Sequence, residues 1–293
     1  MKKTLAVLLL LTSINAFALR AGETTNIDIY LPKSGGKDIF LGVTLVNVQT
    51  GNNGFQDVNY KGTLINFTFD YGISDKMAFF INQKDYGVTA SAGGSYDYKG
   101  VAATTLGIKG LFNVGNPYLY YDLSYSSYLL SKRNEDNSGS NIFGNNSLIQ
   151  ADDDRDHVIG SVGLGVPFSQ VFSVMGVYHY YHFLDTKYDN AGTSQTFKAA
   201  AGNTWKLYFQ FNEDSKLGVA YGEGSIAEHD VDSSGVTSQI PERKFKMTQI
   251  YAIIPIGDTS DLFLDGEQID PKDSTLYSKY DSLYLSLGFR ARF

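Results

Sequence analysis

The four histidines, His157, His179, His182 and His229, are the side chains best suited to acid–base or metal chemistry. His179 and His182 lie three residues apart, so on a β-strand they point to opposite faces and cannot readily hold one ion. Ser161 follows His157 by four residues, on the same strand face but about 13 Å away. A nucleophilic serine must touch its histidine, so we expect no catalytic pair here.

The common enzyme signatures are absent from the chain. There is no P-loop, no HExxH motif and no G-x-S-x-G motif. The absence of cysteine excludes disulfides, thiolate metal sites and cysteine nucleophiles. We therefore predict no catalytic residue, no cofactor and no metal centre.

An acidic stretch, Asp152–Asp156, ends the longest polar segment, and 134–137 (NEDN) begins it. Carboxylates at this density could hold Ca²⁺, or bridge divalent ions to lipid phosphates. The stretch lacks the spacing and the glycine of an EF-hand loop. A solvated loop is the favoured interpretation.

The first eighteen residues have the pattern of a bacterial secretory signal. Lys2 and Lys3 give a basic start, the run 5–11 (LAVLLLL) is apolar, and Ala16 and Ala18 form the small-x-small cleavage pattern. We expect residues 1–18 to be a signal peptide that is removed after Ala18. An uncleaved anchor would need a longer apolar run.

Apolar and polar residues alternate through most of the rest of the chain, and this period of two is typical of β-strands. The clearest case is the last segment, where Leu283, Leu285, Leu287 and Phe289 share one face. The alternation predicts twelve strands, at 39–49, 62–72, 76–86, 101–112, 118–130, 157–167, 171–184, 197–211, 216–225, 244–256, 261–268 and 279–293. Strands 171–184 and 244–256 are apolar on both faces, so their orientation stays open.

Short turns and long polar loops alternate strictly between these strands. Most of the strands have about the 9–11 residues that a tilted strand needs to cross a bilayer. Short turns on one side and long loops on the other are characteristic of transmembrane barrels. The sequence thus predicts an all-β protein: a transmembrane antiparallel up-and-down β-barrel of about twelve strands over 39–293. Residues 19–38 would form a periplasmic segment or a plug in the lumen.

The polar face of the strands supplies the residues expected to line the lumen. They are Asn66, Asp70, Lys109, Tyr120, Asp122, Lys206, Gln210, Tyr284, Arg290 and Arg292. Aromatic residues near both strand ends predict interfacial belts. Tyr71, Tyr118, Phe168 and Phe211 would lie at the short-turn end, and Tyr60 at the long-loop end.

In these features the chain resembles bacterial outer-membrane β-barrel proteins of the porin-like class, without matching any one family. The closing segment 284–293 (YLSLGFRARF) ends in an alternating row, Leu287, Phe289 and Phe293. In that class such a row is read by the barrel-insertion machinery. The resemblance implies the outer membrane as location, with membrane lipids, lipopolysaccharide and the insertion machinery as partners.

The favoured function is a narrow passive channel for small polar or charged solutes. Inward glycines at 107, 163, 165, 218 and 222 would leave space in the lumen, and the loop Ser131–Asp156 would filter its mouth. One alternative is a non-conducting structural or surface-recognition barrel; another is an outer-membrane lipid hydrolase using Ser161. The net charge of −7 argues against nucleic-acid binding. The oligomeric state stays open.

Overall fold

The computed structural model describes residues 30–51, 58–91, 95–113, 117–127, 133–136, 156–169, 171–190, 193–212, 215–233, 235–272 and 279–293. The expected signal peptide, with Ala16 and Ala18, lies outside these residues, as does most of the acidic loop. Among the described residues, no helix is long and apolar enough to cross a membrane.

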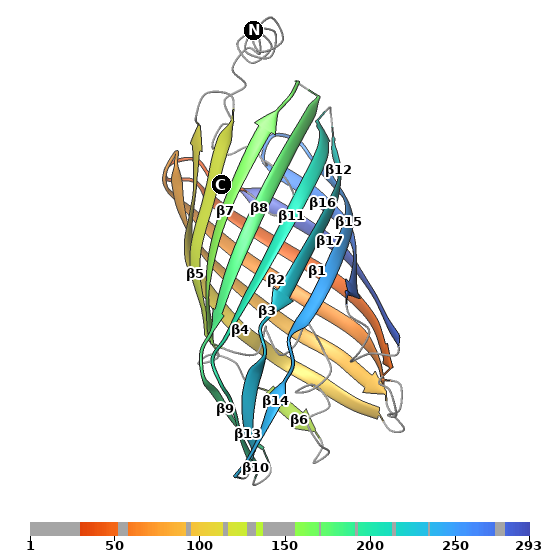
Figure 1. Ribbon diagram of the computed structural model, residues 1–293. Helices are drawn as coiled ribbons and strands as arrows, with labels where there is room; N and C mark the ends of the chain where they lie inside the picture. Colours follow the sequence, from red (N-terminus) through yellow and green to blue (C-terminus); the bar gives the residue numbers. More distant parts are fainter. Residues whose placement is uncertain are drawn as a thin grey trace, which may run out of the picture.

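Twelve antiparallel strands form a closed barrel (Figure 1). They are β1 (Lys37–Gly51), β2 (Val58–Ser74), β3 (Met77–Ser91), β4 (Ser95–Asn113), β5 (Tyr118–Ser127), β7 (His157–Pro167), β8 (Phe172–Phe183), β11 (Ala200–Asn212), β12 (Lys216–Ile226), β15 (Arg243–Pro255), β16 (Ser260–Pro271) and β17 (Lys279–Arg292). Each strand pairs with its neighbour along the chain, and β1 pairs with β17 to close the barrel. The predicted fold class is confirmed, and each predicted strand overlaps one observed strand.

Four further strands form a second sheet beyond the barrel, where the sequence predicted only loops. They are β9 (Thr186–Asn190), β10 (Thr193–Phe197), β13 (His229–Ser233) and β14 (Val236–Ile240). Figure 1 shows them projecting from the lower end of the view, which is the long-loop end. Their polar sequences read as loops because no apolar row marks a buried face. The sequence could not show their pairing, because β10 of the β8–β11 connection pairs with β13 of the β12–β15 connection, and these segments are far apart in the chain.

A short strand also forms within the longest predicted loop. β6 (Arg133–Asp136) pairs with residues 97–100 of β4. This part of the 131–156 loop therefore runs back along the barrel wall.

The outer surface of the barrel carries the apolar row of each strand. Leu41, Leu45, Leu123, Val162 and Leu285 are among the large apolar side chains that stay exposed. Because lipid tails cover such a row, apolar exposure here is the expected state of a membrane barrel.

The structure shows which faces of strands β8 and β15 point into the barrel, which the sequence left open. In β8, Met175 and Val177 are buried inside and Tyr178 and Tyr180 are exposed. In β15, Tyr251 and Ile253 are buried while Ile250 is exposed.

The aromatic belts are present only in part. Tyr71, Phe168 and Phe211 are exposed near the short turns, as expected for an interfacial belt. Tyr118 and Tyr60, which were expected in the belts, are buried instead. Both side chains lie on the inward faces of their strands. The alternation of inward and outward residues therefore predicted their burial better than their closeness to a strand end did.

The inward glycines do not leave open space. A Cβ at Gly165 would lie 2.0 Å from the ring of Tyr118, and a Cβ at Gly218 would lie 2.2 Å from that of Tyr251. Gly107 is covered by Phe80 in the same way. These glycines make room for neighbouring aromatic rings, so the argument from glycine to an open pore was wrong.

A charge in the middle of the lipid-facing row should destabilise the barrel. Leu285 lies near the centre of β17, beside Leu45 on β1. We expect Leu285→Arg to lower the free energy of unfolding by about 2–4 kcal/mol, measured by urea unfolding in lipid vesicles.

The matched control is Val236→Arg, in the second sheet beyond the barrel, where the side chain is already 68% exposed. This variant should unfold at the wild-type urea concentration. Equal losses in the two variants would contradict the membrane placement of the outward row.

Candidate functional site

A cavity of about 380 Å³ lies inside the barrel and is the candidate functional site. Its wall combines polar side chains with aromatic ones, and the polar side chains come mainly from the inward rows of β2, β3, β5, β7 and β8. The lining includes Asn66, Thr68, Asp70, Asn82, Lys84, Thr105, Lys109, Tyr120, Asp122, Ser124, Ser126, His157, Ser161, His179, Tyr181 and Arg290. Strand alternation thus brings together residues that are far apart in the chain.

Amide and hydroxyl groups form cross-strand hydrogen bonds on one side of the cavity. Asn82 Nδ2 donates to Asn66 Oδ1 at 2.6 Å and to Thr68 Oγ1 at 2.7 Å. The hydroxyls of Thr105 and Ser126 lie 3.0 Å apart. These bonds hold the polar wall in one arrangement.

Ser161 pairs with His179 and not with His157. The Ser161 Oγ lies 2.7 Å from His179 Nδ1, because β7 and β8 are in register at these residues. The His157 ring contacts the ring of Phe183 instead. From the sequence we considered only the pair His157 and Ser161 on one strand, so this contact between neighbouring strands was missed.

The surroundings of this pair differ from those of a hydrolase. Asp122 lies opposite Ser161 on β5, so the serine sits between the carboxylate and His179. A catalytic relay needs the carboxylate against the histidine. Asp122 accepts a hydrogen bond from Tyr120 at 2.7 Å. The pair also lines the interior cavity and does not face lipid tails.

Buried ion pairs mark the short-turn end of the cavity. Lys109 Nζ lies 2.7 Å from Asp70 Oδ1, and the side chains are 12% and 1% exposed. Arg290 Nε lies 3.3 Å from Asp38 Oδ1, with Asp38 fully buried. Arg292 pairs with Asp261 nearby. Charges this deeply buried are tolerated because each has an opposite partner.

The segment before β1 enters the barrel at this end. Tyr30, Leu31 and Pro32 are buried. The Arg290 guanidinium lies 4.2 Å from the centre of the Tyr30 ring and 4.7 Å from that of Phe263. Stacking of a cation between two aromatic rings is favourable, and more so away from water.

Gly72 provides the place where this segment docks. Its carbonyl accepts from Gly35 N at 2.8 Å, and its own N–H donates to Gly36 O at 3.0 Å. A Cβ at Gly72 would lie 1.9 Å from the carbonyl oxygen of Lys33. Only glycine permits this approach of two backbones.

An apolar cluster fills the barrel beside the docked segment. It comprises Leu31, Ala78, Leu111, Tyr118, Tyr120, Met175, Val177, Tyr208, Ala220, Tyr251, Ile253 and Phe263. Leu31 belongs to the segment before β1, and the other members are inward residues of the strands. The short-turn half of the barrel is therefore a packed core.

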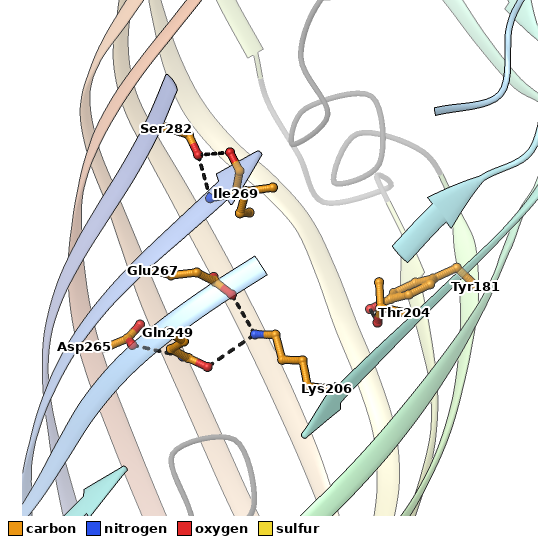
Figure 2. Close-up of polar contacts among 8 residues, drawn as sticks. All are labelled: Tyr181, Thr204, Lys206, Gln249, Asp265, Glu267, Ile269 and Ser282. Carbon is orange, nitrogen blue, oxygen red and sulfur yellow. Dashed lines mark hydrogen bonds and ion pairs between the residues drawn. The ribbon is translucent and has the colours of Figure 1, made fainter. Parts of the chain in front are cut away.

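A second polar cluster lies on the wall formed by β11, β15 and β16 (Figure 2). Lys206 Nζ reaches across β12 and β15 to Glu267 Oε1 at 2.7 Å. Gln249 donates to Asp265 Oδ1 at 2.9 Å and accepts from Lys206 at 3.4 Å. On this wall Lys206 and Glu267 form an ion pair, and the Asp265 carboxylate accepts its hydrogen bond from the neutral Gln249 amide.

The structure places the predicted lumen residues in three groups. Asn66, Asp70, Lys109, Tyr120, Asp122 and Arg290 border the cavity. Lys206 belongs to the second polar cluster, and Gln210 accepts from the buried hydroxyl of Tyr251 at 2.9 Å. Tyr284 is buried, and Arg292 pairs with Asp261.

Several important residues were missed from the sequence. Asp38, Asn82, Thr105 and Glu267 lie on the inward faces of their strands, so following the alternation along the whole of each strand, and one residue before the first, could have found them. Nothing in the sequence pointed to Tyr30. In the part of the chain that the structure describes, no group of His, Asp or Glu is arranged to hold a metal ion.

Comparison with known proteins identifies the fold. No protein-family model and no curated protein matches the chain. Among solved structures, it is similar to the COG4313 outer membrane channel from Pseudomonas putida F1, with a TM-score of 0.66 and 12% identity, covering 92% of this chain and 100% of the other.

Two autotransporter structures are also similar. The transport unit of AIDA-I from Escherichia coli has a TM-score of 0.53 at 10% identity, covering 97% of this chain and 96% of that one. The translocator domain of NalP from Neisseria meningitidis has a TM-score of 0.51 at 10% identity, covering 88% of each. The chain thus has the fold of outer-membrane β-barrel proteins, and the resemblance drawn from its sequence is confirmed.

Loss of one partner of the Lys109–Asp70 pair should be costly. Lys109→Met leaves the buried Asp70 carboxylate without its cation, and we expect a loss of about 3–5 kcal/mol in the free energy of unfolding. Fluorescence of Trp205 during urea unfolding in vesicles would measure it.

The double variant Lys109→Met/Asp70→Leu removes both charges and serves as the control. Its stability should return most of the way to wild type, because no unpaired charge is then buried. A double variant as unstable as the single one would show that the pair is not the source of the effect.

Proposed function

We propose that this protein is an outer-membrane channel for small polar solutes and that the described conformation is its closed state. The polar cavity in the barrel is the observation that carries the proposal, because a passive channel needs a space inside the barrel that a polar solute can occupy. In this proposal solutes enter from the long-loop end, which faces the cell exterior. They bind in the cavity until the periplasmic end opens.

The segment 30–36 is the proposed gate on the periplasmic side. Its Tyr30 stacks on Arg290 and its Leu31 joins the apolar cluster. The gate contacts the barrel through backbone hydrogen bonds to Gly72, cation–π contacts of Tyr30 and the apolar packing of Leu31. None of these contacts belongs to the pairing of the barrel strands, so the segment can leave without breaking that pairing. From the sequence we expected an open lumen filtered by an extracellular loop. The proposal instead has a lumen that segment 30–36 closes at the periplasmic end.

We propose that assembly follows the pattern expected from the class. The proposed signal peptide exports the chain, and the row Leu287, Phe289 and Phe293 is the proposed signal for the insertion machinery. Leu287 and Phe289 are exposed on the outer face of β17, and Phe293, directly after the strand, is exposed as well. Such a partner, and later the membrane lipids and lipopolysaccharide, can reach all three side chains there.

Planar-bilayer recording with Gly72→Val tests the gate. A side chain at this position cannot coexist with the carbonyl of Lys33, so the segment should be displaced. We expect low conductance from the wild-type barrel and a several-fold increase in the variant.

Gly160→Val is the matched control, because a Cβ at Gly160 meets nothing within 4 Å. It should conduct as the wild type does. Heat-modifiable gel migration would establish that all three barrels are folded. Folded barrels that never conduct above the bare membrane would rule out the channel.

The second sheet favours one other candidate, a surface-recognition barrel. β9, β10, β13 and β14 extend the protein beyond the barrel wall, where a partner could bind them. Absent conductance together with cell or ligand binding that is lost on removal of 229–240 would support this function instead.

A further inference from the structure

The cavity wall consists largely of groups that both donate and accept hydrogen bonds. The hydroxyls of Thr68, Thr105, Ser124 and Ser126 and the amide of Asn82 all line it. Each hydroxyl has one donor and two acceptor positions, so one cross-strand bond leaves capacity for a solute. A solute with many hydroxyl groups has the same mixed character.

The charges around the cavity are already matched. Lys84, Lys109 and Arg290 line it with Asp70 and Asp122, and Asp38 pairs with Arg290, which makes three basic and three acidic groups. Asp70 is held by Lys109, and Asp122 accepts from Tyr120. A charged solute would lose its hydration and find Lys109, Arg290 and their carboxylates already in ion pairs, so the wall favours neutral solutes.

Aromatic rings complete the wall. Phe80, Tyr120 and Tyr181 line the cavity together with the polar groups. An aromatic ring offers a flat apolar surface with a negative face, to which the C–H face of a sugar ring can stack. The volume of about 380 Å³ lies in the lower part of the range for small-molecule sites.

We infer that the cavity binds a small neutral polyhydroxylated solute, a sugar of about one or two rings or a polyol of similar size. This inference rests on the proposed channel function for transport, but binding itself does not require an open gate. It assigns the hydroxyl and amide groups of β2–β5 to the solute's hydroxyls and the aromatic rings to its apolar face.

Liposome swelling with the wild-type and Gly72→Val proteins tests the solute class. Glucose should enter several-fold faster than gluconate, glucosamine or glutamine, which are of similar size but anionic, cationic and zwitterionic. Equal rates for all four would overturn the inference while leaving the channel in place. A preference for glutamine would assign the cavity to zwitterions instead and overturn it as well.

Variants of the wall test the cavity directly. Asn82→Leu/Thr105→Val removes an amide and a hydroxyl from the lining and should lower glucose entry several-fold, a larger factor than any change in salt conductance. Thr248→Val makes the same threonine change on the exposed outer face of β15 and should have no effect. If the double variant fails to fold, Ser126→Ala offers a smaller change with the same expected direction.

Calorimetric titration with glucose separates this inference from the channel proposal. If no protein conducts but glucose binds and Ser126→Ala weakens that binding, the channel proposal fails and the sugar site stands. If salt passes but glucose neither binds nor enters preferentially, the sugar site fails and the channel stands.

Discussion

The pairing of β1 with β17 is the constraint on which the rest of the molecule depends. A bilayer offers no water to backbone N–H and C=O groups, so a sheet can cross it only when its two edge strands meet. Fourteen register positions, from Asp38 opposite Arg292 to Gly51 opposite Lys279, close the barrel here. Closure also determines which residues face one another inside. The Phe40 ring covers Gly42 and Gly288, which are paired across the closing strands. Arg290 comes within ion-pair distance of Asp38.

The interior is divided along the barrel axis, and this division gives the protein its functional character. Near the short turns, aromatic rings fill the space above inward glycines, and the segment 30–36 adds Tyr30 and Leu31 to the packing. Farther along, hydroxyl, amide and paired charged groups surround a cavity. A barrel of twelve strands lies between small barrels that side chains fill and wide ones that hold water. This protein combines the two arrangements in one lumen. Side chains fill the short-turn end, and a polar cavity occupies the middle.

Most of the fold could be predicted because the period of two is a local property. Alternation located all twelve barrel strands, and the spacing of turns indicated their antiparallel order. It was less informative where both faces are apolar, as in β8 and β15, and where neither face is, as in β9 and β14. Tyr118 and Tyr60 were expected at the membrane interface because they lie near strand ends. Both are buried inside the barrel, because they belong to the inward faces of their strands.

By itself the sequence determined which side of a strand a residue occupies wherever one face is polar and the other apolar, since this alternation needs no knowledge of the neighbouring strands. It thereby selected Asp70, Lys109, Lys206 and Arg290 for the interior. Only the tertiary structure decided their partners, because register between strands depends on closure and turn geometry across the whole barrel. The contacts of Ser161 with His179 and of Lys206 with Glu267 join residues 18 and 61 positions apart. The docking of Tyr30 against Arg290 likewise depends on a space that exists only once the barrel has closed.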